Sequence, residues 1–413
     1  MAETIVHPPL HFIALLLALL PLTVSAQSFA IGTPTSIGPL EDLLPKKRTE
    51  TRPEAGKSGP WGHLDLYTVF LEAPREVIEL ATPAETKTQW VFEKHDRKDV
   101  HAFLQQLHLP EGVLASLEDE TKWSETGSST VVFPDNQTLL SIPREPRARL
   151  YNFLGRFLSN PLHREPEIIY GESPEKWLSD TDLPTHIVDA IAKMSYLRGG
   201  KQVFADTPAV LALAESDHER IRIQQALSRT PNLIVKVRID SEQPMQTIAR
   251  WWTANGLLTE NIPLLKSLLA SGREDSVDIS RFLPAAAKKV IFTYPTPLDA
   301  RLGHLPDCHW SSLNFFNDPP LDRLSDPRIA ASYVRENYEP ITSEPQFGDI
   351  LFFMDPVTKE AHHSCVFLAD DIVFTKNGRS LLEPWVFMHL AEVRDIYGMH
   401  VASETVIYRR RKT

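Results

Sequence analysis

The chain has 413 residues, a formal net charge of −11 and a hydrophobic fraction of 42%. This length exceeds a single compact core of ordinary size, so we expect two domains with connecting segments. The Lys and Arg residues form no long basic stretch in the sequence. This argues against nucleic acid as a partner, because phosphates are bound by clustered Lys and Arg. The one basic run, residues 409–412, is interpreted as a solvated tail.

The N-terminus has the pattern of an export signal. Residues 10–22 are almost all apolar, and Val24-Ser25-Ala26 follows as a small-residue cleavage pattern. Crossing a bilayer takes roughly 20 apolar residues, so we expect a signal peptide over residues 1–26 and no stable membrane span after its removal. An uncleaved anchor is the alternative, because residues 1–9 lack Lys and Arg. Both readings export the protein, to the medium or to the periplasm and cell envelope.

Composition then suggests a linker and a folded region. Residues 27–60 are rich in Pro, Gly and Ser and lack apolar periodicity, which is typical of a tether. Residues 61–284 contain segments with apolar residues at helical spacing and β-rich segments, and they predict a mixed α/β region of unknown role. Strands are expected at residues 64–71, 130–133, 138–142 and 233–239, and helices at residues 98–107, 147–158, 208–215 and 243–255.

The functional signals lie in residues 285–413, and the first of them is Cys308. Apolar residues recur at helical spacing after it, and Pro306 and Pro319 mark the two ends of the segment. Cys308 is therefore expected in the first turn of a short helix. We expect the free N–H groups and the dipole of that turn to lower the pKa of the thiol.

A buried strand and a hairpin follow. Residues 350–354 form a continuous apolar run, and residues 362–368 and 372–378 form two β-rich runs joined by an acidic turn. Period-two alternation places His363 and Cys365 on one face of the first hairpin strand.

This order of elements supplies the parts of a thiol nucleophile. Such a thiol needs a base within hydrogen-bond reach and a third polar group that orients the base. Cys308 and His363 take the first two positions, and Thr375 and Asn377 share a face of the second hairpin strand as candidates for the third. Asn377 is preferred on chemical grounds, since an amide oxygen accepts well from an imidazole N–H.

The same residues resemble the NlpC-type family of papain-like cell-wall hydrolases. Asp307-Cys308 is similar to the start of that family's helix, residues 348–353 to its Gly-Asp strand, and residues 363–368 to the strand that begins with its His. Tyr294 stands about where the family has a Tyr before the Cys. The resemblance implies that Cys308 is the nucleophile and His363 the base, with the third polar position at Thr375.

The resemblance also implies a fold and a substrate. The expected fold is α+β, with a papain-like domain over residues 285–413, in which a helix-borne Cys packs on an antiparallel sheet, after the mixed α/β region. Hydrolysis of an amide bond in a cell-wall peptide is the expected reaction, without metal or cofactor. His309-Trp310 and residues 295–297 depart from the family pattern, so the substrate-facing loop is expected to be remodelled. The expected substrate-binding residues are Tyr294, Asp307, His309 and Trp310.

Three alternatives remain open at this point. A disulfide between Cys308 and Cys365 would remove the nucleophile. A zinc site could be built from soft ligands, although their spacing matches no standard zinc pattern. A domain that kept the fold and lost the activity would bind glycan or peptide without cleaving it. The residues of the zinc alternative are His304, Cys308, His309, His362, His363 and Cys365.

Overall fold

The computed structural model describes residues 54–82, 86–238, 244–270, 276–303, 305–398 and 403–411. Thr51–Thr413 form one compact unit. The expected signal peptide and most of the expected linker lie outside the described residues. The described part is a mixed α/β structure with several antiparallel sheets, and none of its helices is long and apolar enough to span a membrane.

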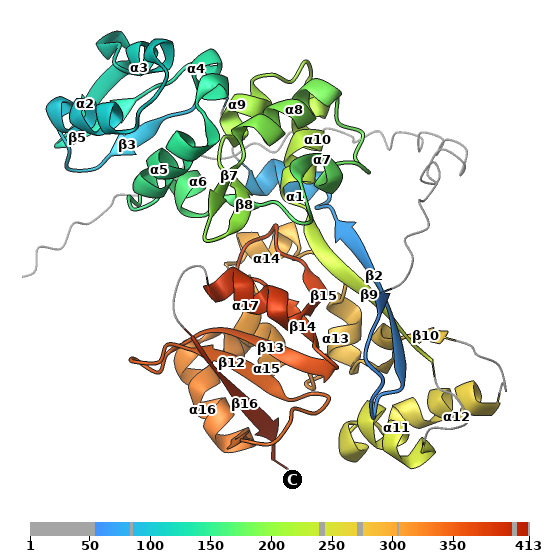
Figure 1. Ribbon diagram of the computed structural model, residues 1–413. Helices are drawn as coiled ribbons and strands as arrows, with labels where there is room; N and C mark the ends of the chain where they lie inside the picture. Colours follow the sequence, from blue (N-terminus) through green and yellow to red (C-terminus); the bar gives the residue numbers. More distant parts are fainter. Residues whose placement is uncertain are drawn as a thin grey trace, which may run out of the picture. The chain divides into compact units, whose positions relative to one another are not determined.

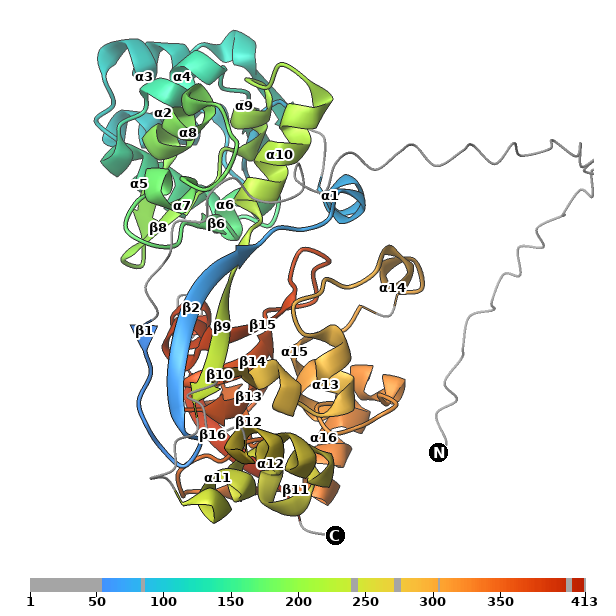
Figure 2. The same ribbon diagram turned by 90° about the vertical axis from the view of Figure 1, so that its right-hand side faces the viewer.

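Two long strands organise the chain. β2 (His63–Leu71) and β9 (Thr230–Arg238) pair antiparallel along their whole length, so they run side by side in Figure 2. β1 (Glu54–Ala55) and β10 (Ser276–Asp278) complete a four-stranded sheet. The folded structure thus begins inside the segment expected to be a linker. Because Leu71 lies opposite Thr230, residues 72–229 leave the strand pair and return to it at the same end. We call these residues the insertion.

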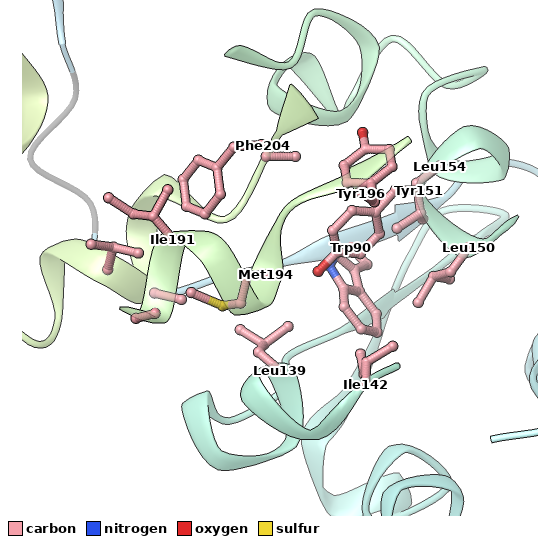
Figure 3. Close-up of a cluster of buried hydrophobic side chains, with 14 of the residues drawn as sticks. Trp90, Leu139, Ile142, Leu150, Tyr151, Leu154, Ile191, Met194, Tyr196 and Phe204 are labelled. Carbon is pink, nitrogen blue, oxygen red and sulfur yellow. The ribbon is translucent and has the colours of Figure 1, made fainter. Parts of the chain in front are cut away.

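The insertion has a hydrophobic core of its own. In α8 (Thr185–Met194), the residues at helical spacing, Ile187, Ile191 and Met194, are buried. They pack with Trp90 and other aromatic side chains (Figure 3). The other helices and strands of the insertion are α1 (Arg75–Ala81), β3 (Trp90–Phe92), α2 (Arg97–Gln106), α3 (Glu111–Leu117), β4 (Trp123–Thr126), β5 (Ser129–Val132), α4 (Asn136–Ser141), α5 (Arg144–Leu154), α6 (Pro161–Arg164), β6 (Glu167–Ile168), α7 (Pro174–Trp177), β7 (Tyr196–Arg198), β8 (Lys201–Phe204), α9 (Thr207–Leu211) and α10 (Asp217–Leu227).

Most of the expected elements in this region are confirmed, and one is wrong. Helices α2 and α5 and strands β2, β5 and β9 match their predictions apart from shifts of the ends, and α9 covers the first half of the helix expected at residues 208–215. Residues 138–142 were expected to form a strand, but α4 occupies most of them. The Asp135 carboxylate accepts a hydrogen bond from the backbone N–H of Thr138 at 2.8 Å. This N-cap satisfies one of the free N–H groups of a first helical turn and favours a helix over the strand.

A six-stranded antiparallel sheet forms the C-terminal part, in the order β11-β16-β12-β13-β14-β15. Helix α15 (Cys308–Leu313) contacts β13 and β14 on one face, and α17 (Leu390–Gly398) packs on the other face (Figure 1). Side chains alternate between these faces: Val366 shares a cluster with Leu313 of α15, whereas Cys365 shares one with Val393 of α17. The strands are β11 (Tyr338–Ile341), β12 (Ile350–Met354), β13 (Ala361–Ala369), β14 (Ile372–Lys376), β15 (Trp385–His389) and β16 (Glu404–Arg410).

The boundary expected at residue 284 does not separate two cores. Leu64 of β2 and Val235 of β9 belong to the same buried cluster as Ile350 of β12. Asn232 of β9 accepts a hydrogen bond from the backbone N–H of Phe387 at 3.0 Å. The residues that flank the insertion therefore fold with the C-terminal sheet. The remaining helices of this part are α11 (Met245–Trp252), α12 (Ile262–Ala270), α13 (Ala285–Val290), α14 (Pro297–Arg301) and α16 (Pro327–Asn337).

Candidate active site

Cys308 is the first residue of α15, as expected. The Asp307 carboxylate caps this helix by accepting from the backbone N–H of Trp310 at 2.8 Å. The cap fixes where the helix begins and so places Cys308 in its first turn. The thiol is free, and only 6% of the residue is exposed.

The Cys308 sulfur lies where the pairing between β13 and β14 stops. The paired residues end at Val366 and Phe374, although β14 continues to Lys376. Phe367 exchanges backbone hydrogen bonds with Gly348 and Asp349 on the β12 side. By alternation, Ser364 directs its N–H to the β14 side. This N–H lowers the pKa of Cys308, which indicates that the sulfur lies on the β14 side of β13, near the end of the ladder.

His363 lies beyond the end of this ladder and connects its two strands. Its ring, carried by β13, is fully buried, and Nε2 lies 3.2 Å from Oγ1 of Thr375 on β14. The Thr375 hydroxyl donates to Oδ1 of Asn377 at 3.1 Å. Since that hydroxyl hydrogen is used, we assign the ring proton to Nε2, which then donates to Thr375. Nδ1 is left unprotonated, and it has no hydrogen-bond partner among the described residues.

The structure thus gives both candidates for the third position a place in one relay. Thr375 contacts the imidazole directly, as the family resemblance implied. Asn377, the chemical preference, stands one bond further along and orients the Thr375 hydroxyl.

Tyr397 of α17 is a site residue that the sequence did not indicate. Its ring stacks on His363 with 3.9 Å between centroids and 18° between planes. Burial raises the pKa of Tyr397, and negative charge on Cys308 or Cys365 would raise it further. The apolar spacing of Leu390, Val393 and Tyr397 in α17 predicts burial, but no signal in the sequence indicates His363 as the partner of Tyr397.

Electrostatics keep Cys308 and His363 neutral. Burial, followed by the Asp307 charge, raises the pKa of Cys308 to about 12, and the N–H groups of Ser364, His309 and Cys308 oppose this only in part. Burial lowers the pKa of His363 well below its usual value, and the neighbouring imidazoles of His309 and His362 lower it further. The expected low thiol pKa is therefore wrong, because the cost of burying a thiolate exceeds the help of the helix start.

The four expected substrate-binding residues fall into two groups. Asp307 and His309 line a cavity of about 660 Å³, and the His309 Nδ1 lies 2.9 Å from the Ser364 hydroxyl. Trp310 instead packs half-buried against the core beneath α15. The Tyr294 hydroxyl donates to the carbonyl of Leu71 at 2.9 Å, and its ring packs beside α1. Trp310 and Tyr294 thus have packing positions rather than positions in this cavity.

The described residues show neither a disulfide nor a metal cluster at the cysteines. Cys308 and Cys365 are both free thiols, and Cys365 is buried with Leu351 and Phe353 on the α17 face of the sheet. Cys365 therefore points away from α15, and His363, which stacks on Tyr397 of α17, lies on the same side of the sheet. In the described part of the chain, no group of three or more His, Cys, Asp or Glu side chains converges as metal ligands would. His304 lies outside the described residues.

Comparison of the chain with protein-family models, with curated proteins and with solved structures gave no match. Function is therefore inferred from the residues and from the geometry of this site.

Proposed function

We propose that the protein is a cysteine hydrolase that cleaves an amide bond, with Cys308 as nucleophile and His363 as general base. One observation carries the proposal. The His363 ring, held by Thr375 of β14, has a nitrogen, Nδ1, without a hydrogen-bond partner among the described residues, and His363 directly precedes Ser364, whose backbone N–H favours negative charge on the Cys308 sulfur. A nucleophile, its base and an orienting group are the parts that thiol catalysis needs.

The reaction would start from two neutral groups. As the sulfur attacks the carbonyl carbon, the thiol proton passes to Nδ1 and the carbonyl oxygen takes up negative charge. The imidazolium then gives this proton to the leaving amine, and the C–N bond breaks. Water attacks the resulting thioester with His363 again as base, which releases a carboxylic acid and restores the thiol. Thr375 and Asn377 hold the ring and stabilise its positive charge through the relay.

Cell-wall peptide is our proposed substrate. The three ordered motifs resemble those of NlpC-type hydrolases, and the N-terminal pattern is that of an exported protein. A helix-borne Cys packed on an antiparallel sheet agrees with the papain-like arrangement that the resemblance implies. We place the enzyme in the periplasm or outside the cell on the same grounds.

A second function is favoured by the burial of the pair. Cys308 is 6% exposed and His363 is 0% exposed, and Tyr397 covers the imidazole. Substrate can reach the sulfur only if these covering groups move. A domain that never makes this movement would bind peptide or glycan without cleaving it.

Mass spectrometry of muropeptides incubated with the full-length protein separates the two functions. The hydrolase proposal predicts new amine and carboxylic acid products with the wild type and with Cys365→Ala, but none with Cys308→Ala. Cys365 is a matched control because it is the other buried free thiol. Retention of intact muropeptide by the wild type without products would replace the hydrolase by the binding domain.

A further inference from the structure

A second cavity, of about 850 Å³, lies between the insertion and the C-terminal sheet. Asn377 of the relay and Tyr397 line it from the sheet side, and Glu167 and Tyr170 line it from the insertion. The insertion therefore contributes one wall of a cavity whose other wall includes two residues of the candidate active site.

Two carboxyl groups face this cavity. Glu167 comes from the insertion and Glu383 from the chain that precedes β15. Neither side chain forms a hydrogen bond or an ion pair with a described residue, and both lie deep among protein atoms while remaining partly open to the cavity. Burial raises the pKa of Glu167 to about 8, helped by the nearby Glu383, and raises the pKa of Glu383 to about 7.

Three positive groups near the cavity have partners of their own. The Lys376 ammonium, whose charge lowers the pKa of Glu383, donates to the carbonyls of Gly378 and Ser380. The Arg198 guanidinium donates to the carbonyls of His163 and Arg164, and Arg229 pairs with Asp180. The other titratable groups that line the cavity are Arg164 and Glu165, both exposed, and the phenols of Tyr170 and Tyr397.

We propose that this cavity binds the ammonium group of a peptide substrate between Glu167 and Glu383. The proposal rests on the hydrolase function and assigns its substrate class, a peptide that carries a free amine. An ammonium offers three donors and a positive charge, so it satisfies both carboxylates through charge-assisted hydrogen bonds. An anionic group in the same position would meet two carboxylates.

The location of this cavity also suggests how substrate binding is coupled to catalysis. An ammonium held between Glu167 and Glu383 places the rest of the peptide beside Asn377 and Tyr397. Tyr397 covers His363. The insertion then selects the substrate, and the sheet supplies the reactive pair.

Binding of two matched peptides to full-length Cys308→Ala protein tests the proposal by calorimetry at pH 8. The probes are N-acetyl-Ala-Lys-Ala-amide and the same peptide acetylated on the lysine amine. We expect the free amine form to bind roughly tenfold more tightly or better, as hydrogen bonds between charged groups allow. Its affinity should rise between pH 6 and pH 9, because the carboxyls must ionise before they attract the ammonium.

Glutamine variants locate the binding site. Glu167→Gln and Glu383→Gln should each remove most of the preference for the free amine, whereas Glu145→Gln, exposed on α5, should keep it. Equal binding of the two peptides, no binding of either, or a preference that survives both variants would overturn the proposal. The Cys308→Ala variant lacks the proposed nucleophile, so the binding results do not test hydrolysis. The product assay with the wild type tests the hydrolase proposal separately.

Discussion

The insertion and the C-terminal sheet each bury a network of polar side chains, and the two networks differ in how their charges and hydrogen-bonding groups are paired. In the insertion, Nη1 of Arg147 lies 2.6 Å from the Asp206 carboxylate and 2.9 Å from the Tyr151 hydroxyl. That hydroxyl donates to Asp206 at 2.6 Å, which closes a triangle in which the two charges neutralise each other. In the sheet, Cys308 and His363 are neutral, and Nδ1 has no partner among the described residues.

This difference separates a structural network from a candidate catalytic one. A buried ion pair joined by short hydrogen bonds resists the loss of either member and holds its surroundings in one arrangement. A buried base with a free lone pair contributes no bond of its own, and the insertion also buries one, Nε2 of His163. What distinguishes His363 is that the Cys308-bearing helix α15 packs on its strand. Substitutions in the two networks should therefore change different quantities.

The largest effect should follow from removal of the base. We expect His363→Ala to lower hydrolysis of the substrate by about 10⁴-fold, because the proposed mechanism gives the thiol proton to His363. Initial rates of product formation measure this effect. His186→Ala, exposed on α8, is the control and should keep the wild-type rate. Comparable rates in the two variants would remove His363 from the mechanism.

Asp206→Ala should instead lower stability. Loss of this carboxylate leaves the Arg147 charge buried without its counter-ion, which costs about 3–5 kcal/mol in the free energy of unfolding. Urea titration of the full-length protein measures the change. Asp217→Ala breaks the exposed ion pair with Arg220 and should cost under about 1 kcal/mol. A similar small loss in both variants would mean that the triangle contributes no special stability.

A smaller kinetic effect is expected along the relay. Thr375→Val keeps the shape of the side chain but removes the acceptor of Nε2, so the rate should fall by about 10²-fold. Thr375→Ser restores the hydroxyl and should recover most of the rate. Asn377→Ala acts through Thr375 and should cost only about tenfold. Failure of the serine variant to recover activity would indicate a packing role for Thr375.

The smallest effect concerns pH and the cavity beside the site. The folded protein keeps the Glu167 proton up to a pH of about 8, its raised pKa, while an unfolded Glu releases it near 4.5. Folding therefore binds a proton between these values, and stability falls as pH rises through this window. Glu167→Gln should make the decline between pH 5 and pH 8 shallower by roughly 1–2 kcal/mol in denaturant titrations. An unchanged slope would show that Glu167 ionises normally.

The local pattern of the sequence predicted where the candidate residues lie in their helix and strand. Proline punctuation and apolar spacing placed Cys308 at a helix start, and alternation placed His363 and Cys365 on one face of β13. Those features depend on neighbours in the chain. The strand expected at residues 138–142 failed because a single cap, from Asp135, outweighs a short β-rich pattern.

Features set by distant residues could not be read in the same way. The pairing of β2 with β9 joins Leu71 to Thr230 across the whole insertion, so the apparent boundary at residue 284 reflected composition rather than packing. The pKa of Cys308 depends on burial by the surrounding fold, and the stacking of Tyr397 depends on where α17 returns to the sheet.

The most direct test of the central claim needs no substrate. In the Cys365→Ala background, the rate at which iodoacetamide labels Cys308 at pH 7 can be compared with and without His363→Gln, which keeps a polar side chain of similar size. If His363 withdraws the thiol proton, labelling should be slow in the parent, because burial raises the pKa of the thiol, and roughly tenfold slower still in the variant. An equal or faster rate without the imidazole would contradict the pairing of Cys308 with His363.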